Sequence, residues 1–200
     1  MNADYYAKML LASCSMPALL KMKPSNLINI NKRIFWQGDL LKILQSEILK
    51  FDCCSFILYE DSNLVNYMVY DKELLGQTLV LPDNRRFLMS YGYQLPEDKI
   101  SDTLYTLKQR FNIYHDRTDS SVNFPHEIGV ILGYPVRDVE DFIRYKGKNY
   151  TLNGVWKAYH NTKEAEKKFI EYKIIRNCAI RMVNAGINLI EINEYGRFQN

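Results

Sequence analysis

The sequence predicts an α+β protein that is mostly helical and carries a small antiparallel sheet built from hairpins. Three observations support this class. Apolar residues recur every three or four positions in several long stretches, which is typical of amphipathic helices. A few short segments are rich in β-branched and aromatic residues and are bounded by turn residues, as hairpin strands are. The 200 residues are 47% hydrophobic and 24% charged, which is enough for a substantial core.

The first third of the chain is expected to hold two helices and a hairpin. Residues 4–12 read as a short helix, and residues 17–30 as a connection that ends in an extended piece. An amphipathic helix is predicted over 36–50, because its leucines and isoleucines fall on one face. Residues 53–59 and 64–70 then read as two strands joined by a polar turn.

The middle of the chain reads as a series of helices. An aspartate can cap a short helix over 71–75, and a second helix is expected over 82–91, where a glycine follows. A long helix is predicted from Pro96 to Phe111, because its apolar residues form one stripe. Residues 115–123 are expected to form a polar loop.

A second hairpin and a long helix are expected near the C-terminus. A helix over 135–146 precedes a hairpin over 149–159, whose turn is predicted at Asn153-Gly154, the strongest two-residue turn signal. A helix capped by threonine follows over 162–185, and residues 187–192 alternate like an edge strand. We expect a single domain over 1–200, with 124–200 as a candidate C-terminal subdomain.

The composition restricts the class of protein. The 26 basic and 23 acidic residues are well mixed and give a net charge of +3, without the basic concentration that nucleic-acid binders usually show. No run approaches the ~20 apolar residues of a membrane span, and the N-terminus lacks the pattern of a signal peptide. A cytoplasmic protein without membrane contact is therefore expected.

The cysteines point to no metal site and no disulfide framework. Cys14, Cys53, Cys54 and Cys178 lack metal-type spacing, and no Cys-x-x-Cys motif occurs. Cys53 and Cys54 would point to opposite faces of a strand, which places them poorly for a shared metal or a bridge. The sequence identifies no cofactor and no metal, and a reducing cytosol fits this cysteine usage best.

The most informative segment is FPHEIGVILGYP, residues 124–135. Pro125 and Glu127 suit the first turn of a helix, where a missing N–H is harmless and a negative charge is favoured. Gly129 and Gly133 lie four residues apart on one face. Two explanations are compatible with each other: another backbone approaches closely there, and Gly133 is the left-handed residue that ends the helix. The segment therefore predicts a tightly placed short helix.

His126 supports two interpretations. It could act as a general base that Glu127 or a distant carboxylate orients, or it could bond a backbone carbonyl and fix the start of the helix. The zinc-protease motif needs a second histidine four residues later, which is missing here.

The hairpin that follows carries a second group of candidates. Trp156 and Ala158 are expected to alternate with Lys157 and Tyr159 along a strand. One face then packs on helices, and the alternative is that Lys157 and Tyr159 line a pocket for an anionic or aromatic ligand. The candidate ligand or partner site comprises His126, Glu127, Tyr134, Trp156, Lys157 and Tyr159.

In these residues the chain resembles the uncharacterised domain-of-unknown-function 3793 family of anaerobic Gram-positive bacteria. The resemblance rests on FPHEIGVILGYPVRDVEDFI at 124–143 and on the GKNY and GVWKAY stretches that follow. Cys14 and Pro17 are similar to a second family motif of His-Cys-x-Pro type, but Ser13 replaces the histidine here and the spacing from Cys to Pro is one residue longer. The resemblance implies a likeness over most of the chain and no established activity.

Three functions are compatible with these patterns. We expect a non-catalytic protein that binds a small molecule or a protein partner around the 124–135 helix and the hairpin. The chain has neither a phosphate-binding P-loop nor a Gly-x-Ser-x-Gly elbow. The alternative is an enzyme that uses His126 and Glu127 with Cys14 or Cys178. A winged-helix DNA binder is disfavoured, because its second helix would be acidic.

Overall fold

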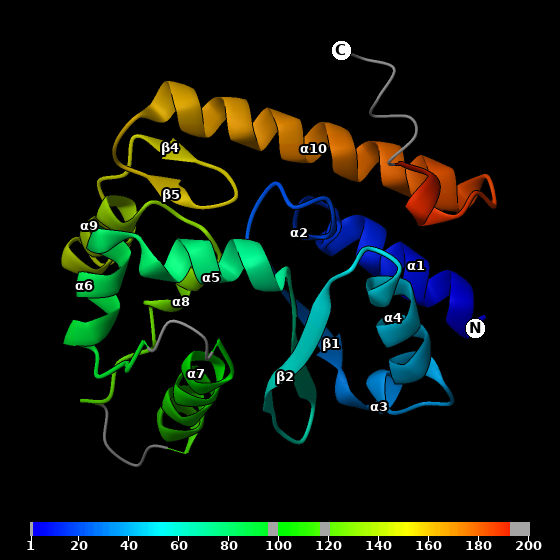
Figure 1. Ribbon diagram of the computed structural model, residues 1–200, viewed down its shortest axis with the longest axis horizontal. Helices are drawn as coiled ribbons and strands as arrows, with labels where there is room; N and C mark the ends of the chain where they lie inside the picture. Colours follow the sequence, from blue (N-terminus) through cyan, green and yellow to red (C-terminus); the bar gives the residue numbers. More distant parts are fainter. Residues whose placement is uncertain (1, 96–99, 117–120, 193–200) are drawn as a thin grey trace. The chain divides into compact units, whose positions relative to one another are not determined.

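In the computed structural model the chain divides into two compact units. Unit 1 comprises residues 1–71 and 170–200, and unit 2 comprises residues 72–169. The structure describes residues 2–95, 100–116 and 121–192. Helix is the main element and the strands are antiparallel, which confirms the predicted α+β class (Figure 1).

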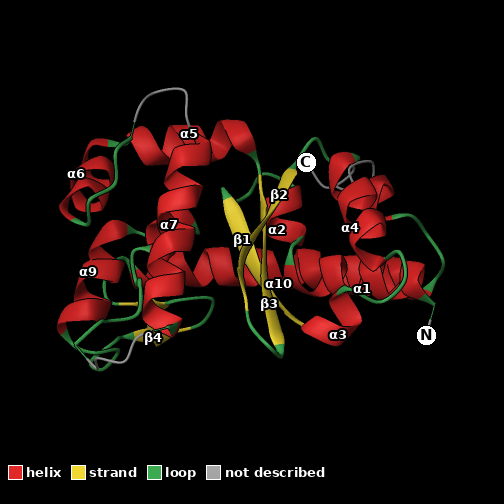
Figure 2. Cartoon of the chain, turned by 90° about the horizontal axis from the view of Figure 1, so that it is seen from below, coloured by secondary structure: helices red, strands yellow, loops and turns green. Residues whose placement is uncertain are grey.

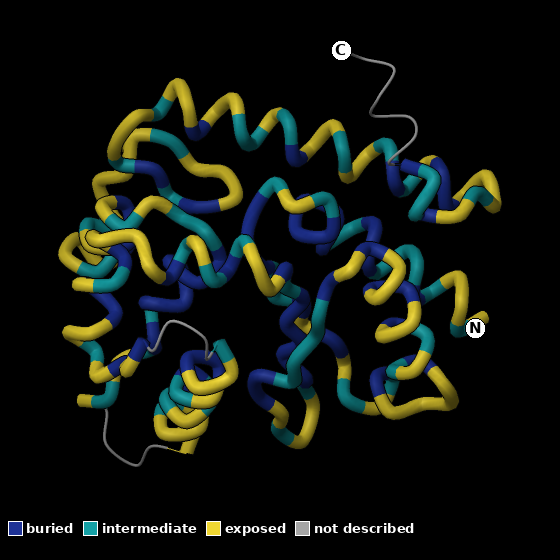
Figure 3. Tube along the Cα trace, viewed as in Figure 1, coloured by how far each residue is buried: buried dark blue, intermediate teal, exposed yellow. Residues whose placement is uncertain are grey.

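Unit 1 contains a three-stranded sheet in the order β1-β3-β2 (Figure 2). β1 spans Ser25–Asn31, β2 spans Cys54–Glu60 and β3 spans Leu64–Tyr70. The central strand β3 pairs antiparallel with both neighbours, and the β2–β3 hairpin lies where the sequence predicts it. Five consecutive residues of β3 are buried, as expected for a central strand covered on both faces (Figure 3).

Helices complete the core of unit 1. They are α1 (Ala3–Cys14), α2 (Met16–Leu19), α3 (Lys32–Phe35), α4 (Leu40–Leu49) and the second half of α10 (Thr162–Asn184). Their buried apolar side chains form one cluster with those of the sheet. Within the residues described, no helix is long and apolar enough to cross a membrane.

Two predictions for unit 1 are wrong in detail. The helix expected over 36–50 starts at Leu40, because Gly38 adopts a left-handed φ of 58° that interrupts it. Residues 187–192 contain the 3₁₀ helix η1 (Leu189–Glu191) in place of the predicted edge strand. Leu189 and Ile192 are both buried, and this spacing of three suits a helical turn better than a strand.

Unit 2 consists of helices and a small hairpin. The helices are α5 (Lys72–Val80), α6 (Pro82–Ser90), α7 (Ile100–His115), α8 (Ile128–Ile131), α9 (Val136–Arg144) and the start of α10. The hairpin consists of β4 (Leu152–Asn153) and β5 (Lys157–Ala158). The predicted helix start at Pro96 lies outside the described residues, and the helix expected over 71–75 extends to Val80.

The predicted two-residue turn at Asn153-Gly154 is wrong. Asn153 belongs to β4, and Gly154, Val155 and Trp156 form the loop. Gly154 lacks the positive φ that this turn requires. A Cβ at Gly154 would overlap the Phe169 ring, and Trp156 packs against the same ring at 4.5 Å between centroids. Packing against α10 therefore overrides the local turn preference.

Candidate ligand site

The 124–135 segment ends as the sequence predicts and begins differently. Gly133 has a φ of 81°, and the Tyr134 N–H donates to the Gly129 carbonyl at 2.8 Å. This is the Schellman arrangement, so Gly133 is the left-handed residue that terminates α8. The expected helical start at Pro125 is wrong, because α8 begins at Ile128 and follows a turn at residues 126–127.

Gly129 is a point of close packing. A Cβ at this position would lie 2.8 Å from Val139 Cγ2 and 3.3 Å from Tyr134 Cδ2. The close approach is thus made by side chains of α9 and of the turn before it, and not by another backbone. The glycine allows α8 to pack directly on α9, which brings the two helices to one side of a cavity.

Gly129→Ala is expected to lower the free energy of unfolding by about 2 kcal/mol, because the added methyl overpacks this contact. Gly76→Ala is the matched control, since Gly76 also lies in a helix of unit 2 and its Cβ would be 3.6 Å from the nearest atom. Gly76→Ala should be neutral or stabilising by up to about 1 kcal/mol. Denaturant unfolding measures both, and equal effects would contradict the packing argument.

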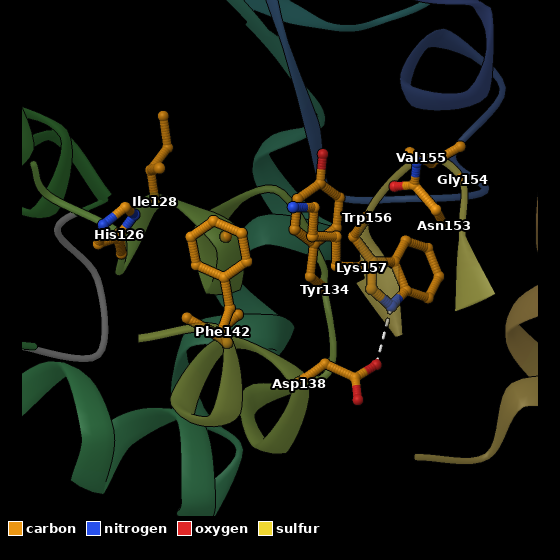
Figure 4. Close-up of a pocket in the computed structure, with 12 residues that line it drawn as sticks. His126, Ile128, Tyr134, Asp138, Phe142, Asn153, Gly154, Val155, Trp156 and Lys157 are labelled. Atoms are coloured by element: carbon orange, nitrogen blue, oxygen red, sulfur yellow. Dashed lines mark hydrogen bonds between the residues drawn. The ribbon is translucent and has the colours of Figure 1, made fainter. Parts of the chain in front are cut away.

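A cavity of about 300 Å³ lies in unit 2 between α8, α9 and the β4–β5 loop (Figure 4). Its wall is mainly apolar and aromatic, with contributions from Ile128, Tyr134, Val139, Phe142, Val155 and Trp156. The polar side chains of the lining are those of His126, Asp138, Asn153 and Lys157. Apolar walls with a few polar groups are typical of small-molecule sites, and this volume is at the lower end of their range.

The cavity collects four of the six candidate residues. His126, Tyr134, Trp156 and Lys157 all line it, although they come from separate segments of the chain. Tyr134 and Trp156 are stacked, with ring centroids 5.3 Å apart and an interplanar angle of 26°. The two remaining candidates, Glu127 and Tyr159, are absent from the cavity wall.

Asp138 fixes the hairpin side of the cavity. Its carboxylate is buried and accepts hydrogen bonds from Trp156 Nε1 at 2.8 Å and from the backbone N–H groups of Tyr159 and His160 at 3.0 Å. In the sequence Asp138 is one of several acidic residues of the predicted 135–146 helix, and this role was missed. An acidic residue in the first turn of a helix gives no sign that a distant hairpin supplies its donors.

Lys157 is held at the wall by its ammonium group. Nζ donates to the Gly147 carbonyl at 2.7 Å and lies 4.8 Å from the Tyr150 ring centroid and 5.7 Å from that of Phe142. The latter two distances are typical of cation–π contacts. The lysine is therefore positioned by one hydrogen bond and two aromatic rings.

His126 contributes an imidazole whose ring contacts are aromatic. Its centroid lies 5.2 Å from that of Phe124 and 5.1 Å from that of Phe142, and the described residues provide it with no hydrogen bond. Burial lowers the pKa of His126 below its ordinary 6.5, although the charge of Glu127 opposes this shift. The imidazole is therefore neutral at pH 7 and has a free donor and a free acceptor.

The lowered pKa of His126 predicts a pH dependence of stability. The unfolded chain binds this proton more readily than the folded protein does, so the stabilisation is complete above pH 6.5 and is lost as the pH falls towards the folded pKa. His126→Phe should remove this loss. We expect wild type to lose more stability than the variant in unfolding experiments between about pH 7 and pH 5. Parallel pH profiles of the free energy of unfolding for wild type and His126→Phe would contradict this prediction.

Glu127 and Tyr159 have other environments. The Glu127 carboxylate is completely buried, forms an ion pair with Arg110 and accepts a hydrogen bond from the Tyr93 hydroxyl at 3.2 Å. The Glu127 carboxylate thus pairs with Arg110 of α7 and is not hydrogen-bonded to His126. Tyr159 stacks on Tyr145, with ring centroids 5.9 Å apart.

Two of the four thiols, those of Cys14 and Cys53, are poor candidates for a nucleophile. Burial raises the pKa of Cys14, although Arg176 opposes this shift. Burial, followed by the charge of Asp71, raises the pKa of Cys53 to about 11. A thiolate is the reactive form, so both cysteines are less reactive than an ordinary thiol. Within the described residues no group of three or more His, Cys, Asp or Glu side chains could hold a metal ion.

The fold and the site together define a mainly helical α+β protein with an aromatic-lined cavity in unit 2. The protein belongs to the family described as "Protein of unknown function (DUF3793)", whose model matches residues 10–193. No curated protein and no solved structure matches the chain.

Proposed function

We propose that this protein is a cytoplasmic, non-catalytic binder of a small, flat, largely apolar molecule, which occupies the cavity between α8, α9 and the β4–β5 loop. The proposal rests chiefly on the convergence of His126, Tyr134, Trp156 and Lys157 on one aromatic-walled cavity. Flat ligands suit such walls, because aromatic rings interact favourably when stacked or edge-to-face. The four free cysteines fit a reducing compartment.

Two observations favour binding over the enzyme alternative. The Glu127 carboxylate is bound by Arg110 and Tyr93, so it does not orient the His126 imidazole. Burial raises the pKa of Cys14, one of the two cysteines named for the enzyme alternative, which opposes the thiolate that a cysteine nucleophile needs. The DNA-binding alternative is weakened because α8 has only four residues and Asp138 of α9 faces the hairpin.

Native mass spectrometry with the planar probe trans-cinnamamide tests the proposal. We expect a one-to-one complex with the wild-type protein and its loss in Val155→Trp, whose larger side chain fills the cavity. Val80→Trp is the matched control, because Val80 is 44% exposed and Val155 is 41% exposed, and Val80 does not line the cavity. Val80→Trp should bind like wild type.

Two results would contradict the proposal. One is the absence of a complex between wild type and millimolar probe. The other is equal binding by wild type and Val155→Trp, since the probe would then lie elsewhere on the protein.

A further inference from the structure

The ammonium group of Lys157 has hydrogen-bonding capacity that the protein does not use. A lysine ammonium carries three donors, and one of them is directed to the Gly147 carbonyl at 2.7 Å. In the part of the chain that the structure describes, no carboxylate forms an ion pair with Lys157. The side chain is half-buried and lines the cavity, and two of its three donors have no acceptor among the residues described.

The protein holds this ammonium group in position before a ligand binds. Gly147 has a φ of 69°, and a Cβ there would lie 3.3 Å from Lys157 Nζ and 3.1 Å from the Phe142 ring. A side chain at Gly147 would thus crowd the lysine against Phe142. Rings on two sides and the Gly147 carbonyl hold Nζ in place, which reduces the entropy that a bound ligand would otherwise have to remove.

The negative charge in the lining already has hydrogen-bond donors within the protein. Asp138 supplies the only carboxylate among the lining residues described, and its oxygens accept hydrogen bonds from the Trp156 indole and two backbone N–H groups. Charge-assisted hydrogen bonds of this kind satisfy a buried carboxylate. Among the lining residues described, the cavity therefore has one ammonium group without a carboxylate partner and one carboxylate that accepts three hydrogen bonds.

We infer that the ligand is a planar aromatic acid, whose ring lies among Tyr134, Phe142 and Trp156 and whose anionic oxygen accepts a hydrogen bond from Lys157 Nζ. This inference rests on the proposed function and adds the charge of the ligand to it. The aromatic wall selects the ring, and the unpaired ammonium selects the anion over a neutral group of the same shape.

Calorimetric titration with trans-cinnamate and trans-cinnamamide tests the inference, because the two probes differ mainly in charge. We expect wild type to bind the acid about tenfold more tightly than the amide, as a charge-assisted hydrogen bond would provide. Lys157→Met should abolish this preference and still bind the amide, and Lys157→Arg should keep part of it. Lys148→Met is the matched control, because exposed Lys148 loses the same charge outside the cavity.

The outcomes separate the two claims. Equal affinities of wild type for acid and amide, or a preference that survives in Lys157→Met, would overturn the inference and leave the proposed binding intact. Loss of the preference in Lys148→Met would also overturn the inference, because the overall charge of the protein, and not Lys157 itself, would then explain the preference for the acid. Failure of both probes to bind wild type would overturn the inference and the proposed function together.

Discussion

Arg110→Met is expected to lower the free energy of unfolding by about 3 to 4 kcal/mol, because it leaves the buried Glu127 carboxylate without its cation. Glu127 is 0% exposed, and its remaining hydrogen bond comes from the Tyr93 hydroxyl at 3.2 Å. A neutral hydroxyl compensates a buried carboxylate much less than a guanidinium does. Arg110 also stacks over the Tyr91 ring, a contact that methionine replaces in part.

Denaturant unfolding followed by Trp156 fluorescence, in a Trp36→Phe background, measures this effect in unit 2. Arg86→Met is the matched control, because Arg86 also pairs with a carboxylate of unit 2 but is 78% exposed. Exposed pairs contribute at most about 1 kcal/mol, so the control should be close to wild type. The double variant Arg110→Met/Glu127→Leu should recover part of the loss. Equal effects of Arg110→Met and Arg86→Met would show that the buried charge is not the cause.

Asp138→Ala should destabilise unit 2 by about 3 kcal/mol, because one substitution removes the acceptor of three hydrogen bonds and each contributes about 1 kcal/mol. The donors are the Trp156 indole and the N–H groups of Tyr159 and His160, so the hairpin should also lose its fixed position on α9. We therefore expect a second result, which is weaker binding of any ligand in the cavity.

The same unfolding assay compares Asp138→Ala with two further variants. Asp138→Asn keeps one oxygen acceptor and should lie between wild type and Asp138→Ala. Glu140→Ala is the control from the same helix, since Glu140 is exposed and surface substitutions usually change stability by less than about 0.5 kcal/mol. If Asp138→Ala behaves like Glu140→Ala, the hydrogen bonds do not hold the hairpin.

Elements whose stability is local could be predicted from the sequence. The strand Leu64–Tyr70 was predicted with its observed bounds, because β-branched and aromatic residues follow a polar turn there. The C-terminus of α8 was predicted because a left-handed residue favours glycine, and Gly133 has this conformation. In both cases neighbouring residues carry enough information to define the structure.

Features that depend on distant packing could not be predicted. The Asn153-Gly154 turn failed because Trp156 and Gly154 pack on Phe169 of α10. Glu127 was considered as a partner of His126, whereas its cation is Arg110, which lies 17 residues earlier in the chain.

The residues of the cavity could be predicted only in part. The sequence indicated His126, Tyr134, Trp156 and Lys157 through their residue types and their proximity to one motif, and all four line the cavity. Phe142 and Asp138 were missed. An aromatic residue on an amphipathic helix gives the same pattern whether it faces the core or a cavity.

The most direct test of the central claim, that the cavity of unit 2 is a ligand site, is the Trp156 indole N–H signal in a ¹⁵N–¹H spectrum. A Trp36→Phe background leaves Trp156 as the single tryptophan. Titration with trans-cinnamate should shift this signal saturably, and Val155→Phe/Trp36→Phe, which fills the cavity without adding a second indole, should prevent the shift. A signal that stays in place while the probe binds would show that the ligand site lies outside this cavity.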